Sequence, residues 1–119
     1  YYGKYGQYPT AIYDLVSGGQ IPIWPLDPLA PVGTSCAANS DNCYWYAYYT
    51  PAGALGPQSY HFGSSLEDSG SPLVNQDRDC TSTSGSGCPY TSAYTSGFTG
   101  SDTAGCGGVA SRHCYDIAQ

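Results

Sequence analysis

Six cysteines in three close pairs constrain the fold of this chain more than any other feature. Each pair encloses a stretch rich in Gly, Ser, Asn or Asp, which is the composition of a turn or loop. An even number of cysteines in a small chain indicates an oxidised, extracytoplasmic protein. Six cysteines allow fifteen connectivities. We predict that nearest neighbours pair, because each bridge then closes a small loop without crossing another. The predicted bridges are Cys36–Cys43, Cys80–Cys88 and Cys106–Cys114.

Metal binding is the alternative role for these cysteines. Structural zinc sites commonly use a C-x-x-C spacing, and none of the three pairs has it. Only His61 and His113 could assist as further ligands. No C-x-x-C-H occurs, so covalent haem attachment is not indicated either. We therefore expect no metal site at the cysteines and no bound cofactor.

The charge balance excludes several classes of partner. Nine acidic side chains face three basic ones, Lys4, Arg78 and Arg112, which are scattered along the chain. Nucleic-acid binding needs clustered positive charge, and an anionic membrane surface would repel this chain for the same reason. We interpret the acidic balance as a solubility feature. An acidic surface that collects divalent cations is the alternative.

Length and composition favour one domain with short strands and long loops. With 119 residues, 16 glycines and 9 prolines, the chain can build only a modest core. Large aliphatic residues are scarce and methionine is absent, but thirteen tyrosines and six cysteines argue against disorder. We interpret most tyrosines as core and interface residues, because tyrosine buries a large area and keeps one polar tip. A carbohydrate-binding platform and charge transport along stacked rings are the alternatives.

Residues 1–18 are interpreted as a helical lead-in. Tyr1, Tyr5 and Tyr8 share one helical face, as in the frayed end of a longer helix, although an extended lead-in is the alternative. Thr10 is expected to cap a second short helix, which ends at Gly18-Gly19. The buried stripe of that helix is predicted to be Ile12, Leu15 and Val16.

Residues 19–43 contain a proline-rich segment and the first cysteine loop. Prolines at positions 22, 25, 28 and 31 exclude a helix or a central strand. The segment should therefore be extended and lie over the core. Its predicted apolar anchors are Ile21, Ile23, Trp24 and Leu26.

Residues 44–67 are predicted to form an antiparallel β-hairpin around the turn PAGALGP. The stretch CYWYAYY, residues 43–49, puts five aromatic rings into seven residues, with rings on both faces of the first strand. Either both faces are covered within the domain, or one is meant for a partner. The second strand carries Tyr60, Phe62 and Leu66 on one face and His61, Gly63 and Ser65 on the other, which suits one buried face.

Residues 68–119 form a Ser/Thr/Gly-rich region that the last two cysteine pairs are expected to hold in place. Its end, Tyr115-Asp116-Ile117, is expected to dock as a last strand or an extended tail. Asp77, Asp79 and Asp102 can bind calcium if the loops bring them together. DRDC lacks the full EF-hand spacing, and solvated loop carboxylates are the alternative interpretation.

No catalytic residue is predicted. The sequence has no G-x-S-x-G, P-loop or dinucleotide fingerprint, and Glu67-Asp68 more plausibly mark the end of a strand. His61 and His113 are expected to pack or to form hydrogen bonds. A small secreted hydrolase would need a pocket that joins one of them to a serine and an acid.

The order of segments resembles the globular domain of bacterial type IV pilins and type II secretion pseudopilins. The resemblance rests on YPTAIYDLVSGGQIPIWPLDP, residues 8–28, followed by a hairpin from YWYAYY to YHFGSSLED. GFTGSD and the final YDI resemble the C-terminal pattern of the family. The family's hydrophobic N-terminal helix is absent from this sequence. The resemblance therefore implies that this helix was removed or belongs to a separate small subunit.

The resemblance implies an α+β pilin-like headgroup: the end of an N-terminal helix, a small antiparallel sheet and long disulfide-pinned loops. The implied function is that of a structural, non-enzymatic subunit of an extracellular type IV pilus-like filament, used for adhesion, motility, DNA uptake or secretion. The implied partners are further copies in a helical filament and, where the helix is a separate chain, that helix subunit, with membrane contact only through the helix. The expected self-assembly interface is Tyr44, Trp45, Tyr46, Tyr48 and Tyr49.

A secreted, disulfide-stabilised binding module, such as a lectin-like domain or adhesin tip, is the alternative function. The Ser/Thr-rich stretch 81–103 is a plausible outer surface and could carry O-linked sugars. No N-x-S/T sequon occurs.

Overall fold

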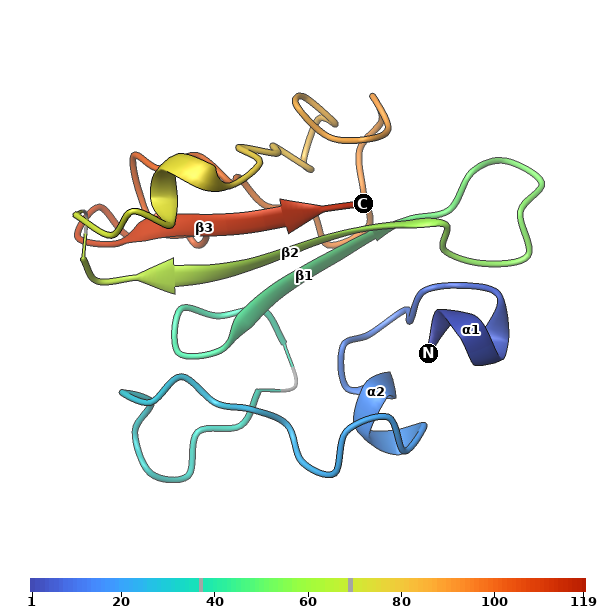
Figure 1. Cartoon of the computed structure of the whole chain (residues 1–119), viewed down its shortest axis with the longest axis horizontal. Helices are drawn as coiled ribbons and strands as arrows, with labels where there is room; N and C mark the ends of the chain where they lie inside the picture. The colour runs from blue at the N-terminus through green and yellow to red at the C-terminus, as the bar shows by residue number, and fades with distance from the viewer. Residues whose placement is uncertain (37, 69) are drawn as a thin grey trace.

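A three-stranded antiparallel sheet forms the centre of the computed structural model, which describes residues 1–36, 38–68 and 70–119 (Figure 1). Two single-turn helices precede the sheet, and long loops cover one of its faces, so the chain is a small α+β protein. None of the helices formed by the described residues is long and apolar enough to cross a membrane. The elements are α1 Tyr2–Tyr5, α2 Asp14–Ser17, β1 Tyr44–Tyr49, β2 Ser59–Leu66, the 3-10 helix η1 Val74–Gln76, and β3 His113–Ala118.

The strand order is β1-β2-β3, with β2 in the middle. β1 and β2 form the hairpin expected from the sequence, in a register that pairs Tyr46 with Phe62. β3 is the expected last strand, and it places Asp116 opposite Gly63. This register puts residues from the middle of the chain and from its C-terminal end on the same face of the sheet.

One face of the sheet, called the polar face because β2 lines it with polar residues, is buried against the C-terminal loops, and the other is the aromatic face. Trp45, Ala47 and Tyr49 of β1 also lie on the polar face and pack in or against the core. On β2 the buried residues are Ser59, His61, Gly63 and Ser65, while the alternate residues are half-buried. The small side chains let the C-terminal loops approach closely. A Cβ atom added to Gly63 would lie 2.7 Å from the Phe98 ring. The aromatic face is only partly covered by the N-terminal segment. Its residues are Tyr44, Tyr46, Tyr48, Tyr60, Phe62, Leu66, Tyr115 and Ile117.

Both edges of the sheet are occupied at their centres by other parts of the chain. On the β1 edge, the Asn39 amide bonds the N–H and C=O of Tyr46, at 2.9 and 3.0 Å. Thr95 exchanges two backbone hydrogen bonds with Tyr48 on the same edge. On the β3 edge, the Asp77 carboxylate accepts from the Asp116 N–H, and the Arg78 N–H donates to the Asp116 carbonyl. Strand addition at these positions is therefore blocked.

The three predicted disulfides are confirmed. The last two bridges lie in the core, where their sulfur atoms take the place of the aliphatic side chains that the chain lacks. The core cluster consists of Ala47, Cys80, Cys88, Tyr94, Phe98, Cys106 and Cys114. The bridge between Cys36 and Cys43 lies outside this cluster, and its loop includes Ala37, which is outside the described residues.

The N-terminal region differs from the expectation in how its helices are capped. Thr10 does not cap α2 with its hydroxyl. The Asp14 carboxylate instead accepts hydrogen bonds from the N–H groups of Thr10 and Ala11, at 3.1 and 3.0 Å. α1 is a single turn that is followed by Gly6, which has a φ of 67°, a conformation that glycine adopts easily. The predicted stripe on α2 is half-buried.

Two of the predicted apolar anchors in the proline-rich segment are wrong. Ile23 is 75% exposed and Leu26 is 43% exposed. Only Trp24 makes an aromatic contact with the sheet, edge-on to Tyr44 with ring centroids 6.1 Å apart. Prolines and turns dictate the path of this segment, so its side chains do not follow the alternation that would bury them.

Candidate functional site

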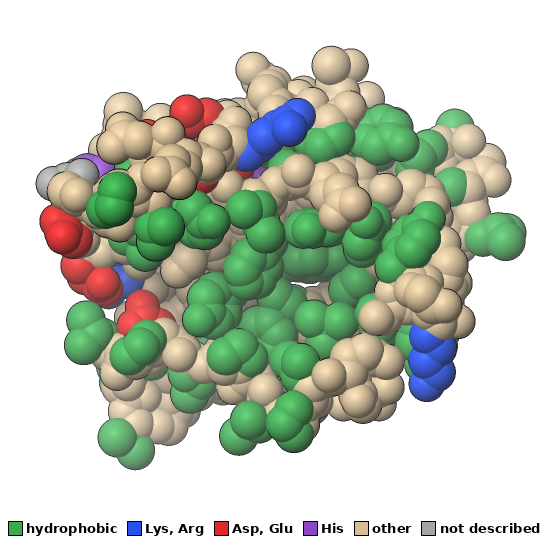
Figure 2. Space-filling model, viewed as in Figure 1, with side chains coloured by type: hydrophobic (Ala, Val, Ile, Leu, Met, Phe, Trp, Pro, Cys, Tyr) green, Lys and Arg blue, Asp and Glu red, His purple; other side chains and the backbone are tan. Residues whose placement is uncertain are grey.

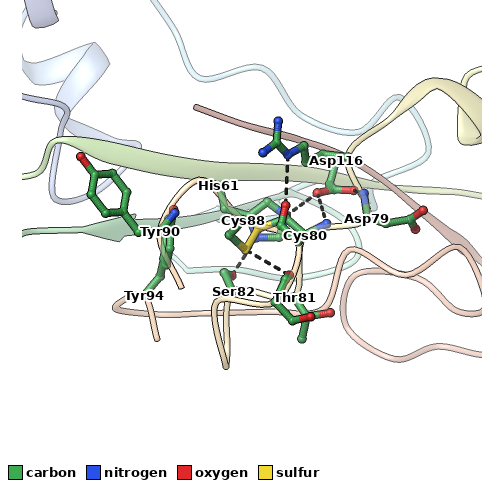
Figure 3. The surroundings of a disulfide bond; sticks show 12 residues. His61, Asp79, Cys80, Thr81, Ser82, Cys88, Tyr90, Tyr94 and Asp116 are labelled. Atoms are coloured by element: carbon green, nitrogen blue, oxygen red, sulfur yellow. Dashed lines mark hydrogen bonds and ion pairs between the residues drawn. A yellow bond between two sulfur atoms is a disulfide. The ribbon is translucent and has the colours of Figure 1, made fainter. Parts of the chain in front are cut away.

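A buried hydrogen-bonded network links three distant parts of the chain beneath the polar face (Figure 3). His61 Nδ1 lies 2.7 Å from Ser82 Oγ, and His61 Nε2 lies 2.7 Å from Asp116 Oδ2. All three residues are 0% exposed. β2 supplies the histidine, β3 supplies the aspartate, and the loop after Cys80 supplies the serine. The network therefore ties the covering loops to the sheet.

Each member of the network has further partners. The Asp116 carboxylate also accepts from the N–H groups of Asp79 and Cys80, at 2.9 and 3.0 Å. Ser82 Oγ accepts from the Phe98 N–H at 2.9 Å and lies 3.1 Å from the Phe98 carbonyl. The His61 ring stacks on the Phe98 ring, with centroids 3.8 Å apart and an interplanar angle of 12°. These contacts satisfy buried polar groups that would otherwise cost folding free energy.

The residue types match those of a serine hydrolase, but the geometry does not suit that chemistry. A nucleophilic serine must reach a substrate carbonyl next to donors that stabilise an oxyanion. Ser82 is fully buried, and the Phe98 backbone already engages its hydroxyl. We infer that this network is structural. His113 is separate from it, with Nδ1 2.6 Å from the Asp102 carbonyl oxygen.

The same region also contains three side chains of metal-binding type, but a disulfide bond makes one of them unavailable. His61, Cys80 and Asp116 each have a potential ligand atom within 4.8 Å of the others. The Cys80 sulfur, however, is bonded to Cys88, and only a free thiolate is a good metal ligand. Glu67 and Asp68 immediately follow β2, as expected for residues that mark a strand end.

The three aspartates named as calcium candidates do gather in the structure. Asp77, Asp79 and Asp102 can each offer one carboxylate oxygen within 4.8 Å of the others. Asp102 Oδ1 is buried and has no hydrogen-bond partner among the described residues. Calcium takes about six to eight oxygen ligands, so three carboxylates supply at most part of its shell. Calcium binding therefore remains a prediction.

Burial, with the neighbouring negative charges, raises the pKa of two of these carboxyl groups. Burial raises the pKa of Asp77 from 3.8 to about 6, and the negative charges of Asp102, Asp116 and Asp79 add to this effect. The hydrogen bond from the Asp116 N–H opposes it. Burial, followed by the charges of Asp79 and Asp116, also raises the pKa of Asp102, while His113 opposes the rise. The Asp77 carboxyl therefore takes up a proton at a pH near 6, well above the range of an ordinary aspartate.

The strand aromatics proposed as an assembly interface are mostly covered by their own chain. Tyr46 is buried, and its hydroxyl donates to the Pro9 carbonyl at 2.8 Å. Tyr44 stacks on Phe62, Trp45 tilts against Phe98, and Tyr49 contacts Tyr90 and Tyr94. Apart from Tyr46, the five are half-buried. Their part in an interface between copies stays a prediction.

Nothing in the sequence alone identifies Ser82 or Asp116 as members of this network. Ser82 is one of many serines and threonines in an aperiodic loop, and nothing nearby distinguishes it. Asp116 had a weak signal, because alternation on the last strand places it on the same face as the buried Cys114. Comparison of the chain with protein-family models, with curated proteins and with solved structures found no match.

Proposed function

We propose that this protein is a structural subunit of an extracellular, type IV pilus-like filament. The proposal rests on the resemblance in segment order, and an α+β body with a helical turn beside an antiparallel sheet is compatible with it. Three disulfides in a small domain fit an oxidising compartment outside the cytoplasm.

The observation that carries the proposal is the incomplete cover of the aromatic face. Tyr44, Tyr60, Phe62 and Tyr115 on this face are half-buried, and Ile117 is 42% exposed. An apolar sheet face of this kind gains stability when another surface covers it. A neighbouring subunit or an apolar helix would provide that cover in a filament.

The occupied sheet edges restrict how copies can associate. Asn39 and Thr95 block the centre of β1, and Asp77 and Arg78 block the centre of β3, so assembly by continuous β-strand addition is disfavoured. Contacts between copies should therefore use side-chain surfaces, as in helical assemblies built from globular heads.

Cryo-electron microscopy of native cell-surface material tests this function. We expect thin filaments whose density fits this three-stranded body, with an apolar helix or a neighbouring copy against the aromatic face. Native material that contains only monodisperse particles would refute the proposal.

A saccharide-binding module is a second candidate, and one cavity favours it. The Trp45 and Phe98 rings, several backbone groups and four hydroxyl side chains line a cavity of about 420 Å³. No charged side chain is among the described residues that line it, which suits a neutral sugar stacked on an aromatic ring. The hydroxyl residues are Thr83, Thr99, Ser101 and Thr103.

A glycan array probed with the monomeric protein tests this second candidate. Binding that Thr99→Val and Thr103→Val weaken together would support it. These residues are exposed, so the variants should fold, and unchanged thermal unfolding would verify this. Absence of binding to every glycan would remove the candidate and leave the filament proposal untouched.

A further inference from the structure

We propose that copies of this chain join head to tail along the longest axis, through two ends with complementary shape and charge; this inference rests on the proposed filament function. The helix end comprises residues 1–9 with α1 and the turn 50–58 between β1 and β2. The proline end comprises the segment 21–36 together with Glu67 and Asp68, which follow β2.

The two ends lie on opposite sides of the molecule. In Figure 1, α1 and the turn after β1 lie at the right, whereas the far bend of the proline-rich segment and the end of β2 lie at the left. The molecule extends 40 Å along this longest axis and 20 Å along its shortest. A copy displaced along the axis would therefore place its proline end against the helix end of its neighbour.

Each end carries an aliphatic projection and an apolar hollow. On the helix end, the side chain of Leu55 is fully exposed at the tip of the turn. On the proline end, Ile23, Trp24 and Leu26 help to line a hollow of about 540 Å³. Leu55 of one copy can thus fill a hollow that the other copy leaves open.

The proline end also carries projecting aliphatic side chains, and the helix end borders a hollow that could receive them. Val32 is fully exposed on the proline end and Leu29 is 69% exposed. The helix end borders an almost wholly apolar hollow of about 330 Å³, whose lining includes Tyr8, Ile12 and Tyr60. Fully exposed aliphatic side chains are costly in water, and two matched pairs of projection and hollow would bury them together.

Charge complementarity identifies the occupant as a second copy. With a net charge of −6, copies repel each other on average. A contact between copies therefore needs two surfaces of locally opposite charge. Residues 1–9 and 50–58 contain no acidic side chain, and they include the exposed Lys4, for which the described residues provide no ion pair. This end is therefore locally positive.

The proline end is locally negative. Asp27 and Glu67 share a single guanidinium, that of Arg112, which lies 3.6 Å from Asp27 and 3.2 Å from Glu67. Asp68 follows Glu67 and is exposed. Three carboxylates and one cation leave a local charge of −2. Figure 2 shows acidic side chains at the left of the molecule and a basic side chain at the right. Because the two contacting surfaces differ, the contact does not close on itself, and it generates an open filament.

A charge-exchange experiment on native filaments tests the inference. Lys4→Glu and Asp68→Lys should each reduce the amount of pelletable filament by about tenfold, because each places like charges across the contact. The double variant should restore assembly, since the charge pair is then present in reverse. Both side chains are exposed, and unchanged thermal unfolding of each soluble variant would show that its fold is intact.

A second variant tests the shape complementarity. Leu55→Ser should weaken assembly, whereas Leu73→Ser, which alters an exposed leucine outside both ends, should not. A photoreactive benzoylphenylalanine at position 55 should crosslink to the segment 21–36 of a neighbour.

If all the single variants form filaments as well as the wild type does, the head-to-tail contact is overturned and the filament function stands. Absence of wild-type filaments would overturn both.

Discussion

His61 Nε2 and Asp116 Oδ2 lie 2.7 Å apart, and both side chains are fully buried. The pair joins β2 to β3, and the Asp116 carboxylate continues the connection to the N–H groups of Asp79 and Cys80. Burying these groups is favourable only while every member keeps its partners. The pair therefore fixes how the loops sit on the sheet.

Removing the Asp116 carboxylate should be strongly destabilising. Asp116→Ala leaves the His61 ring and two backbone N–H groups without an acceptor in a dry environment, which costs about 3–5 kcal/mol. Urea unfolding of the two proteins measures the difference. Asp68→Ala is the matched control, because this carboxylate is exposed and, among the described residues, its one hydrogen-bond donor is the Gly70 N–H. A loss for Asp116→Ala no larger than for the control would contradict the proposed role of the network.

Gly63 should not tolerate a methyl group. The added Cβ would lie 2.7 Å from the Phe98 ring and 2.9 Å from the Cys106 sulfur. Both neighbours are buried in the core and cannot move away. We expect Gly63→Ala to lower the free energy of unfolding by about 1–3 kcal/mol. Gly3→Ala, where the added atom meets nothing within 4 Å, should be neutral or slightly stabilising, and equal effects of the two substitutions would count against this packing.

The hairpin and the last strand could be expected from the sequence because alternation and turn residues are local signals. The identity of the buried face could not. Ser59, His61 and Ser65 have the polarity of a solvent-facing row, while Tyr60 and Phe62 have that of a core. The outcome depends on loops from residues 80–106, which have no periodicity and are placed by disulfides and by the buried network.

The candidate sites also divide into features that leave a local sequence signal and features that depend on long-range packing. Asp77 and Asp79 are close in sequence, so a cluster of loop carboxylates could be anticipated, and Asp102 joins them because its loop passes the same point. The partners of His61 are 21 and 55 residues away from it in sequence. Only the register of β3 and the path of the loop after Cys80 bring them together, and neither leaves a local pattern.

Asp77 should make the stability of the protein depend on pH between about 4 and 6. Its folded-state pKa is raised from 3.8 to about 6, so the folded protein holds a proton that the unfolded chain releases in this window. Stability is therefore lost as the pH rises from 3.8 to 6 and is constant above it. Asp77→Asn keeps an acceptor for the Asp116 N–H, and it should remove the loss of folding stability over this pH range.

The measurement is thermal unfolding of wild type and Asp77→Asn at a series of pH values in the presence of a chelator. We expect the variant to gain a few degrees in Tm relative to wild type as the pH rises from about 4 to 6, with no further gain above it. A difference that is the same at every pH would show that the carboxyl group titrates normally.

Calcium should stabilise the protein only weakly. Asp77, Asp79 and Asp102 supply part of the oxygen shell, which favours affinities of about 0.1–1 mM, typical of extracellular modules. We expect Tm to rise at millimolar calcium and the rise to vanish in Asp102→Asn or after addition of a chelator. A Tm that is insensitive to millimolar calcium would refute the calcium interpretation of this cluster.

The Cys80–Cys88 bridge should contribute more than its loop length indicates. Cys80–Cys88 and Cys36–Cys43 span nearly equal separations, 8 and 7 residues, so the entropy of the unfolded chain assigns about 2.5 kcal/mol to each. Their surroundings differ, because Cys80 and Cys88 belong to the core cluster, whereas Cys43, although buried, lies outside it and Cys36 is half-buried. Replacing Cys80 and Cys88 by alanine therefore removes core volume as well as a crosslink, and it loosens the backbone that donates to Asp116.

We expect the paired alanine variant at 80 and 88 to lose about 1–3 kcal/mol more free energy of unfolding than the paired variant at 36 and 43, as measured by urea unfolding. Equal losses would mean that both bridges act only by restricting the unfolded chain, and that the sulfur atoms do not substitute for the aliphatic side chains that this core lacks.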